Sequence, residues 1–162
     1  MEKINSLTGM TDLIETKADE NVLANKVFQT EKILKEIFTN YAMSEIRTPA
    51  LENTNLFKRS VGDTSDIVNK ELYTFSDKND KSITLRPEGT ASVMRSIIEK
   101  KLDGETHKLW YLGPMWRYER PQKGRYRQFN QAGIEILGYS EGAPEFEMIS
   151  LICELNRKLQ IR

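Results

Sequence analysis

The stretch KLWYLGPMWRYERPQKGRYRQFNQAGIEILGY, from Lys108 to Tyr139, decides the fold predicted for this chain. Its two ends are rich in aromatic and β-branched residues, which favour strands. Between them lies PQKGRY, from Pro121 to Tyr126, whose proline and glycine are typical of a turn. The pattern therefore predicts two antiparallel strands joined by a basic loop.

The loop concentrates positive charge in a chain that is neutral overall. Residues 117–127 contain five basic residues and one acid, whereas the whole chain has 24 Lys and Arg against 24 Asp and Glu. Zero net charge argues against a protein that coats nucleic acid broadly. Arginine binds phosphate oxygens in bidentate fashion, so such a loop could hold a polyphosphate. A solvated basic turn is the structural alternative, and a run of charge alone does not distinguish the two.

The second predicted strand separates its side chains onto two faces, because successive residues of a strand point to opposite sides. An aromatic ring on the polar face could stack on a base, and Gly133 is expected to leave room above the sheet. A half-exposed strand with its polar side in water is the alternative. The predicted core face carries Ala132, Ile134 and Ile136, and the predicted ligand face carries Phe129, Gln131, Gly133 and Glu135.

The rest of the chain predicts an α+β fold, with an antiparallel sheet flanked by helices. Apolar residues recur at helical spacing over residues 21–43, 87–102 and 144–162. The runs at 71–76 and 82–86 predict a hairpin, and Pro49 places the segment 45–52 at a sheet edge or an interface. The predicted helix faces bury, among others, Ile98, Ile152 and the single cysteine, Cys153.

Composition restricts the class of protein. A chain of 162 residues with 38 % hydrophobic and 30 % charged residues suits one soluble domain. No apolar run approaches the length of a membrane span, the N-terminus lacks a signal pattern, and one cysteine excludes an internal disulfide. These features fit the cytosol.

The stretch LRPEGTASVMR, from Leu85 to Arg95, has two possible roles. A glutamate at a helix N-terminus stabilises the free amides there by about 0.3–1 kcal/mol. A carboxylate and a hydroxyl in the same position, Glu88 and Thr90, could instead bind an ammonium group. The chain has no glycine-rich phosphate loop and no Cys/His metal cluster, and its one histidine, His107, has no nucleophile elbow beside it.

Three stretches resemble the histidyl-tRNA synthetase family of class II aminoacyl-tRNA synthetases. They are LRPEGT, WYLGPMWRYERPQKGRYRQFNQAGIEILG and EIRTPALENTNLFKRSVGDTSDIVNKELYTF. The resemblance runs from about Gly9 to the end of the chain, and its central motif is long and specific. The basic hairpin is similar to the second signature motif of class II synthetases. The helix before EIRTPALE, with Pro49, is similar to the first motif, which builds a homodimer interface in this family.

The resemblance implies a class II synthetase-like catalytic domain and its reaction. Histidine and ATP give histidyl-adenylate and pyrophosphate, and the histidyl group then passes to tRNA(His). The implied enzyme is a cytoplasmic homodimer without a membrane segment. Mg²⁺ is expected to bridge the ATP phosphates, with no metal site built by the protein itself.

The resemblance also implies roles for individual residues. Arg117 is expected to contact the α-phosphate and stabilise the charge that develops on it, and Arg125 to reach the β- and γ-phosphates. Glu119 is expected to accept a hydrogen bond from the adenine amino group, and Phe129 to stack on adenine. Three residues, Glu88, Thr90 and Gln131, are expected to bind the amino and carboxylate groups of histidine. Glu135 is expected to bind its imidazole, and Gln122 to lie near the tRNA acceptor end.

The sequence departs from the family pattern in two ways. The usual RQFHQ is RQFNQ here, with Asn130; alternation points this residue away from the ligand face, so little effect is expected. The third class II motif, a later catalytic arginine and the anticodon-binding domain are absent. Residues 1–162 are therefore expected to be the N-terminal portion of a catalytic domain, with weak or no activity alone.

Two other functions remain open. Some relatives of this family are regulatory subunits of ATP phosphoribosyltransferase, which bind histidine without charging tRNA. Such relatives tend to lose parts of the ATP and tRNA motifs, whereas RYERPQKGRYRQF is complete here. A purely structural or dimerisation piece would bind neither histidine nor ATP.

Overall fold

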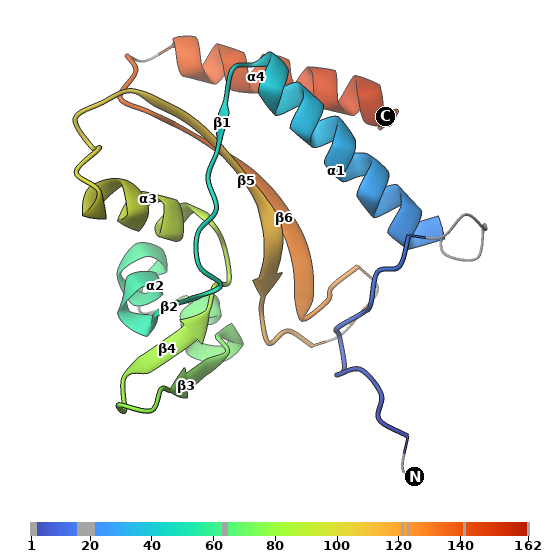
Figure 1. Cartoon of the computed structure of the whole chain (residues 1–162), viewed down its shortest axis with the longest axis vertical. Coiled ribbons are helices and arrows are strands. Elements are labelled where there is room, and N and C mark those ends of the chain that lie inside the picture. Colours follow the sequence, from blue (N-terminus) through green and yellow to red (C-terminus); the bar gives the residue numbers. More distant parts are fainter. Residues whose placement is uncertain are drawn as a thin grey trace. The chain divides into compact units, whose positions relative to one another are not determined.

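The computed structural model describes residues 3–15, 22–62, 65–120, 122, 124–140 and 142–161. Figure 1 shows the chain, which divides into two units built from segments distant in the sequence. Two long strands, β5 (His107–Trp116) and β6 (Gln128–Leu137), run through both units, as the sequence predicted from their composition. The first unit comprises Met1–Asp12, Arg47–Leu102 and Tyr111–Gly133, and the second comprises Leu13–Ile46, Asp103–Trp110 and Ile134–Arg162.

The first unit contains a small antiparallel sheet in the order β2-β4-β3 (Figure 1). Strands β3 (Thr74–Ser76) and β4 (Ser82–Leu85) form the predicted hairpin. Strand β2 (Leu51–Asn53) lies at the edge of this sheet, two residues after Pro49. The edge position predicted from that proline is confirmed, since proline lacks the N–H that an inner strand must donate.

Among the described residues, three helical segments belong to the first unit. Helix α2 (Thr54–Val61) begins after Asn53, whose side-chain oxygen accepts a hydrogen bond of 2.9 Å from the amide of Asn55. A π-helical turn (Ile67–Glu71) follows, and α3 (Thr90–Glu99) connects β4 to β5. The most deeply buried side chains of this unit are Phe57, Thr84, Pro87, Ser92, Val93 and Met115.

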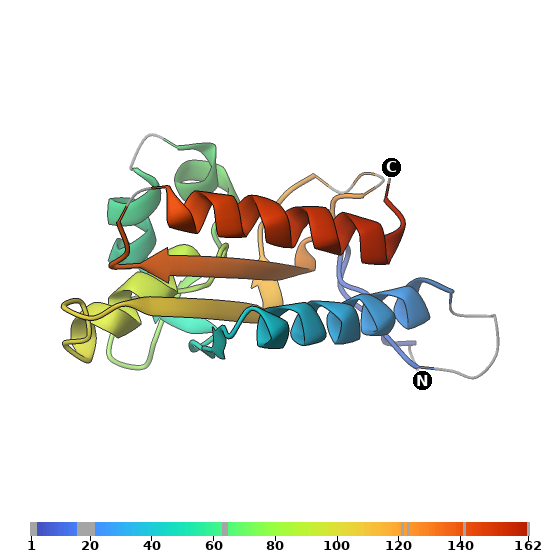
Figure 2. The same ribbon diagram turned by 90° about the horizontal axis from the view of Figure 1, so that it is seen from above.

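The second unit pairs two helices with the outer ends of the long strands. Helices α1 (Val22–Asn40) and α4 (Ala143–Leu159) run in opposite directions (Figure 2) and are joined by an ion pair of 2.7 Å between Glu36 and Lys158. The rings of Phe38 and Trp110 stack with centroids 5.1 Å apart. The core of this unit consists of Ala24, Leu34, Ile37, Phe38, Met43, Leu109, Trp110 and Leu151.

One strand pairing differs from the predicted antiparallel sheet. The two-residue strand β1 (Ser44–Glu45) lies parallel to β5, with Ser44 opposite Leu109 and Glu45 opposite Trp110. A parallel pair needs a long connection between its strands, and here more than sixty residues separate β1 from β5. The fold class is α+β, as predicted, and no described helix is both long and apolar enough to cross a membrane.

Several predicted core residues are exposed. Ile98 of α3 and Ile152 of α4 have exposed fractions of 61 % and 49 %. Cys153 and Ala132 are also exposed, so neither is the core residue that the sequence pattern predicted. Apolar spacing identified the helices α1, α3 and α4, but the side that is buried depends on which segments pack against it.

Candidate functional site

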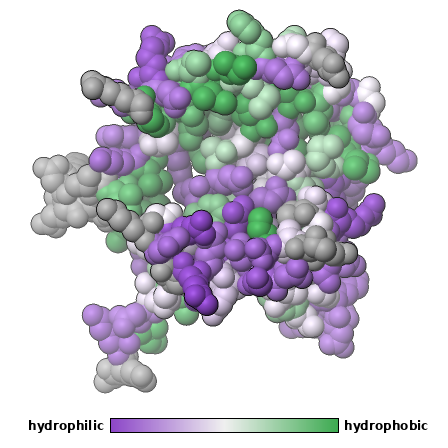
Figure 3. All heavy atoms as spheres, turned by 180° about the vertical axis from the view of Figure 1, so that it is seen from behind, coloured by the Kyte–Doolittle hydropathy of each residue, from purple (hydrophilic) through white to green (hydrophobic). Residues whose placement is uncertain are grey.

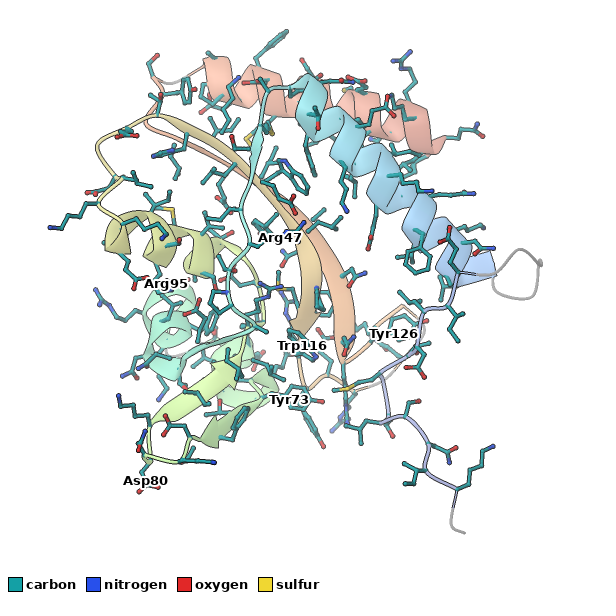
Figure 4. The ribbon with its side chains drawn as sticks, viewed as in Figure 1. Arg47, Tyr73, Asp80, Arg95, Trp116 and Tyr126 are labelled. Carbon is teal, nitrogen blue, oxygen red and sulfur yellow. The ribbon has the colours of Figure 1, made fainter. Side chains whose placement is uncertain are left out.

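The basic hairpin has a defined register. The amide of Arg117 donates to the carbonyl of Arg127 at 3.0 Å, and Trp116 Nε1, at the end of β5 (Figure 4), donates to Gln128 Oε1 at 3.2 Å. The two strands are antiparallel, so a pairing of residue 117 with residue 127 also pairs Tyr111 with Gly133, six residues further along each strand. Phe129 and Gln131 lie on one face of the hairpin, as side-chain alternation predicted, and the register places Arg117 on the same face.

Arg117 is held at the end of β5 by two contacts. Its guanidinium carbon lies 5.1 Å from the centre of the Phe129 ring, a cation–π distance. Its Nε donates to the carbonyl of Pro87 at 2.9 Å. Within the described part of the chain, no acidic side chain forms an ion pair with this half-buried arginine. A partly buried cation without a carboxylate partner is suited to receive an anionic group.

Two of the loop cations are engaged by the protein itself. Arg125 Nη1 lies 3.2 Å from Glu119 Oε2; the arginine side chain is 61 % exposed and that of the glutamate 16 %. The Arg127 guanidinium lies 3.9 Å from the Tyr118 ring and also donates from Nε to the carbonyl of Glu119 at 3.3 Å. Arg127 thus has a structural role, whereas Arg125 is exposed on one side and able to reorient.

The tip of the loop is a tight turn that exposes Gln122. The amide of Arg125 donates to the carbonyl of Gln122 at 2.9 Å, and Gly124 has a φ of 83°. Such a backbone conformation favours glycine because it lacks a Cβ. Gln122 is exposed at this tip. Lys123, which contributes to the predicted basic cluster, lies outside the described residues.

Glu88 caps helix α3. Its two carboxylate oxygens accept hydrogen bonds from the backbone amides of Thr90 (2.6 Å) and Ala91 (3.0 Å). The capping role that the sequence offered for this glutamate is therefore present. A carboxylate has about four acceptor positions, so Glu88 retains capacity for a ligand donor. Thr90 lies in the first turn of α3 and is exposed.

Gln131 carries an unsatisfied acceptor on the same hairpin face. Its Oε1 is buried and has no hydrogen-bond partner among the described residues. Buried polar groups are nearly always paired, because leaving one unpaired destabilises the fold by about 1–3 kcal/mol. The Gln131 amide is therefore a candidate to bind a hydrogen-bond donor such as an ammonium group.

The expected room above Gly133 is occupied, and this expectation was wrong. A Cβ added at Gly133 would overlap Cζ and Oη of Tyr111, whose ring covers the glycine. Glycine is required here by close approach of an aromatic ring, and no empty space results. The hairpin register explains the contact, because Tyr111 is the cross-strand neighbour of Gly133.

Arg86 and Gly9 also support the site, although sequence reasoning assigned them no role. Arg86 donates to the carbonyls of Pro114 (3.1 Å) and Thr48 (2.7 Å), and burial lowers the pKa of its guanidinium. Gly9 accepts hydrogen bonds from the amides of Arg127 (2.8 Å) and Gln128. These bonds fix the Arg86–Pro87 backbone and the start of β6; the arginine immediately before Pro87 was the only local signal in the sequence.

A groove of about 690 Å³ lies between α2 and α3, next to the helix start that Glu88 caps. Of the predicted site residues, it includes only Thr90. Its wall contains Leu56, Met94 and Ile98, together with Arg95, which extends from α3 in Figure 4. The groove thus does not coincide with the hairpin face formed by Arg117, Phe129 and Gln131.

The structure brings some predicted residues together and leaves others apart. Direct contacts join Glu88 to Thr90, Glu119 to Arg125, and Arg117 to Phe129. Glu135 is half-buried on β6 but belongs to the second unit. No group of three or more His, Cys, Asp and Glu side chains that could hold a metal ion occurs within the described ranges.

Comparison with known proteins identifies the family. A family model described as histidyl-tRNA synthetase matches residues 20–162. The histidine–tRNA ligase of Desulfitobacterium hafniense strain DCB-2 is 54 % identical over 134 residues, covering 82 % of this chain and 32 % of the relative. That of Prochlorococcus marinus strain MIT 9515 is 45 % identical over 163 residues, covering 100 % and 37 %. The chain thus spans about a third of the length of these curated relatives.

Solved structures agree with this result. An apo histidyl-tRNA synthetase from S. aureus superposes with a TM-score of 0.75 at 38 % identity, covering 96 % of this chain and 35 % of that chain. A protein from Bacillus halodurans C, described as an ATP phosphoribosyltransferase regulatory subunit/histidyl-tRNA synthetase, gives a TM-score of 0.76 over 98 % and 40 % of the two chains. Its identity is 21 %, so it supports the fold alone. The sequence and structural similarity together show that this chain belongs to the histidyl-tRNA synthetase family.

Proposed function

We propose that this chain is the N-terminal portion of the catalytic domain of a histidine–tRNA ligase. Such an enzyme joins histidine to ATP, forming histidyl-adenylate and pyrophosphate, and then transfers the histidyl group to tRNA(His). The observation that carries the proposal is Arg117, a half-buried arginine beside an aromatic ring with no acidic partner among the described residues. Membership of the family supplies the reaction to which this geometry is fitted.

The nucleotide is proposed to bind along the hairpin. Arg117 contacts the α-phosphate and stabilises negative charge that develops there during adenylate formation. The adenine ring stacks on Phe129, and Glu119 accepts from its amino group. Arg125 leaves Glu119 and binds the β- and γ-phosphates; its ion pair is mostly exposed and so holds it only weakly. Mg²⁺ is proposed to accompany ATP by bridging its phosphates.

Histidine is proposed to bind between the start of α3 and β6. The unpaired Gln131 Oε1 accepts from the α-ammonium group, and Glu88 supplies a negative charge beside it. Thr90 provides a hydroxyl for the same end of the amino acid. The assignments of Glu135 to the imidazole and of Gln122 to the tRNA acceptor end rest on the family resemblance.

The remaining assignments follow from the family. The chain corresponds to about a third of its relatives, so we infer that the third class II motif and the anticodon-binding domain belong to the other two thirds. Residues 1–162 alone are expected to show weak or no activity. A cytoplasmic homodimer, formed through α1 and the segment around Pro49, completes the proposal; sedimentation of the full-length enzyme tests its dimeric state.

The proposal is tested by histidine-dependent ATP–pyrophosphate exchange in a full-length ligase that contains this chain. Arg117→Ala is expected to lower kcat by about 100-fold or more, because it removes a donor to the developing charge. Arg117→Lys keeps the charge but not the planar fork, so partial activity is expected. Arg157→Ala removes an exposed cation from α4 and is the matched control.

Two results would contradict the proposal. Absence of exchange with histidine in the unaltered enzyme would remove the ligase assignment. Near-normal kcat in Arg117→Ala would remove the α-phosphate role. Histidine binding without ATP–pyrophosphate exchange and without charging of tRNA(His) would instead favour a regulatory relative that binds histidine. Calorimetry that detects neither histidine nor ATP binding would favour a structural piece.

A further inference from the structure

Tyr111 occupies an unusual position between two glycines. The residue lies on β5 and is 7 % exposed. A Cβ added at Gly89 would overlap Cε2 and Cζ of its ring, and a Cβ added at Gly133 would overlap Cζ and Oη. The ring therefore lies in direct contact with the backbone at the start of α3 and with the backbone of β6. A larger residue than glycine at either position would force the ring or the backbone to shift.

The two glycines neighbour the residues proposed to bind histidine. Gly89 is the N-cap residue of α3 and lies between Glu88 and Thr90. Gly133 lies two residues after Gln131 on β6, and the buried Oε1 of Gln131 has no hydrogen-bond partner among the described residues. The Tyr111 ring thus lies between the backbone next to Glu88 and the backbone of the strand that carries Gln131.

We infer that Tyr111 is a positioning residue that sets the distance between the α3 start and β6, and thereby fixes Glu88 relative to Gln131. This inference rests on the proposed function. A ring is suited to the role because it is rigid and is in contact with both backbones. An aliphatic side chain would leave a gap into which one backbone could move, and displacement of binding groups by about 1 Å can lower activity about 100-fold. The ring does not itself touch histidine in this proposal.

The contacts on the ATP side have anchors other than this ring. Arg117 is anchored by Pro87 and Phe129, and Arg86 fixes the same segment through Thr48 and Pro114. Loss of the ring is therefore expected to affect histidine binding and to leave ATP binding unchanged. A general loss of folding would reduce the active fraction without changing either KM.

The experiment compares KM for histidine with KM for ATP in pyrophosphate exchange by the full-length ligase. Tyr111→Leu is expected to raise the histidine KM about tenfold or more while the ATP KM stays within about twofold. Tyr111→Phe retains the ring and its Cζ, which contacts both glycines, and should give a histidine KM within about threefold of that of the unaltered enzyme. Tyr139→Leu, at an exposed tyrosine, is the matched control. Equal changes in both KM values, or an unchanged histidine KM in Tyr111→Leu, would overturn the inference.

A second variant tests the same contact from the other strand. Gly133→Ala places a methyl group against the ring and should also raise the histidine KM. Combining it with Tyr111→Leu relieves the overlap, so the effects on the free energy of unfolding should be strongly non-additive. This coupling is measured by unfolding and does not require enzyme activity. It therefore tests the contact between Tyr111 and Gly133 even if the ligase assignment is wrong. Additive effects would show that the ring does not separate the two backbones.

Discussion

Asp77 organises the β3–β4 hairpin with its side chain. Its Oδ1 accepts hydrogen bonds from the amides of Asn79 (2.8 Å) and Lys81 (2.9 Å). These two bonds to the ionised form hold the pKa of Asp77 below its usual value of 3.8. The turn at residues 77–81 is therefore held by a side chain, because one carboxylate accepts hydrogen bonds from two of its backbone amides.

The lowered pKa of Asp77 predicts a pH-dependent contribution to stability. Since the folded-state pKa is below the unfolded one, the contribution is present above the unfolded value and lost as the pH falls through the folded value. Asp77→Asn removes this dependence. Urea unfolding of both proteins should show a larger difference in unfolding free energy at about pH 7 than at about pH 3. A difference that is equal at both pH values contradicts the role of the charge.

Individual side chains at the proposed site were only partly predictable. Alternation along β6 correctly placed Phe129 and Gln131 on one face, because it follows from strand geometry alone. The contact between Tyr111 and Gly133 depends on the register of the hairpin, which no local pattern contains. The hydrogen bonds of Glu88 to the first turn of α3 show its capping role, which no local pattern distinguished from a ligand-binding role.

At the scale of elements, an ion pair connects α3 to β2. Arg95 Nε and Nη2 donate to Glu52 Oε1 at 3.2 and 2.7 Å, and the Glu52 side chain is only 7 % exposed. Arg95 also pairs with the exposed Glu99 on its own helix, and both carboxylates raise the pKa of its guanidinium, Glu52 most. The buried partner is the one that matters for stability, because water screens the exposed one.

Replacement of Arg95 should therefore destabilise the first unit. Arg95→Ala leaves the Glu52 carboxylate buried without its cation, which is expected to reduce the free energy of unfolding by about 1–3 kcal/mol. Glu99→Ala removes only the exposed pair and should change it by less than about 1 kcal/mol. Chemical denaturation measures both variants. Equal effects would mean that burial of Glu52 does not determine the energy of the contact.

The helices illustrate what periodicity predicts and what it leaves open. The spacing of apolar residues predicted α1, α3 and α4 with nearly correct limits. It also assigned Ile98, Ile152 and Cys153 to the core, and all three are exposed. An apolar residue at helical spacing is buried only where another element covers it, and that depends on residues distant in the sequence.

At the scale of the whole molecule, α4 presents an apolar surface. Phe146, Ile149 and Ile152 have exposed fractions of 74, 61 and 49 %, with the exposed Cys153 beside them. Figure 3 shows apolar side chains gathered in its upper part, at the height of α4 in Figure 1. Exposed clusters of this kind promote association of soluble proteins.

The 162-residue chain is therefore expected to self-associate through α4. A double variant that carries Phe146→Ser and Ile149→Ser should associate less than the unaltered chain. Sedimentation velocity at rising protein concentration measures this association. The free energy of unfolding should change little, because both side chains are already in water. Leu151→Ser, on the buried side of the same helix, is the contrasting control and should destabilise the fold. If the double variant associates as strongly as the unaltered chain, α4 is not the surface through which the chain associates.

The sequence by itself determined the class of fold, the two hairpins, the edge position after Pro49 and the family. These follow from local periodicity, turn chemistry and a long motif, each of which is carried by neighbouring residues. Only the tertiary structure decided that a tyrosine fills the space above Gly133, that Glu119 pairs with Arg125, and that Arg117 lies against Phe129 without an acidic partner among the described residues. The physical reason is that these contacts join residues brought together by strand register and helix packing, which local sequence patterns do not specify.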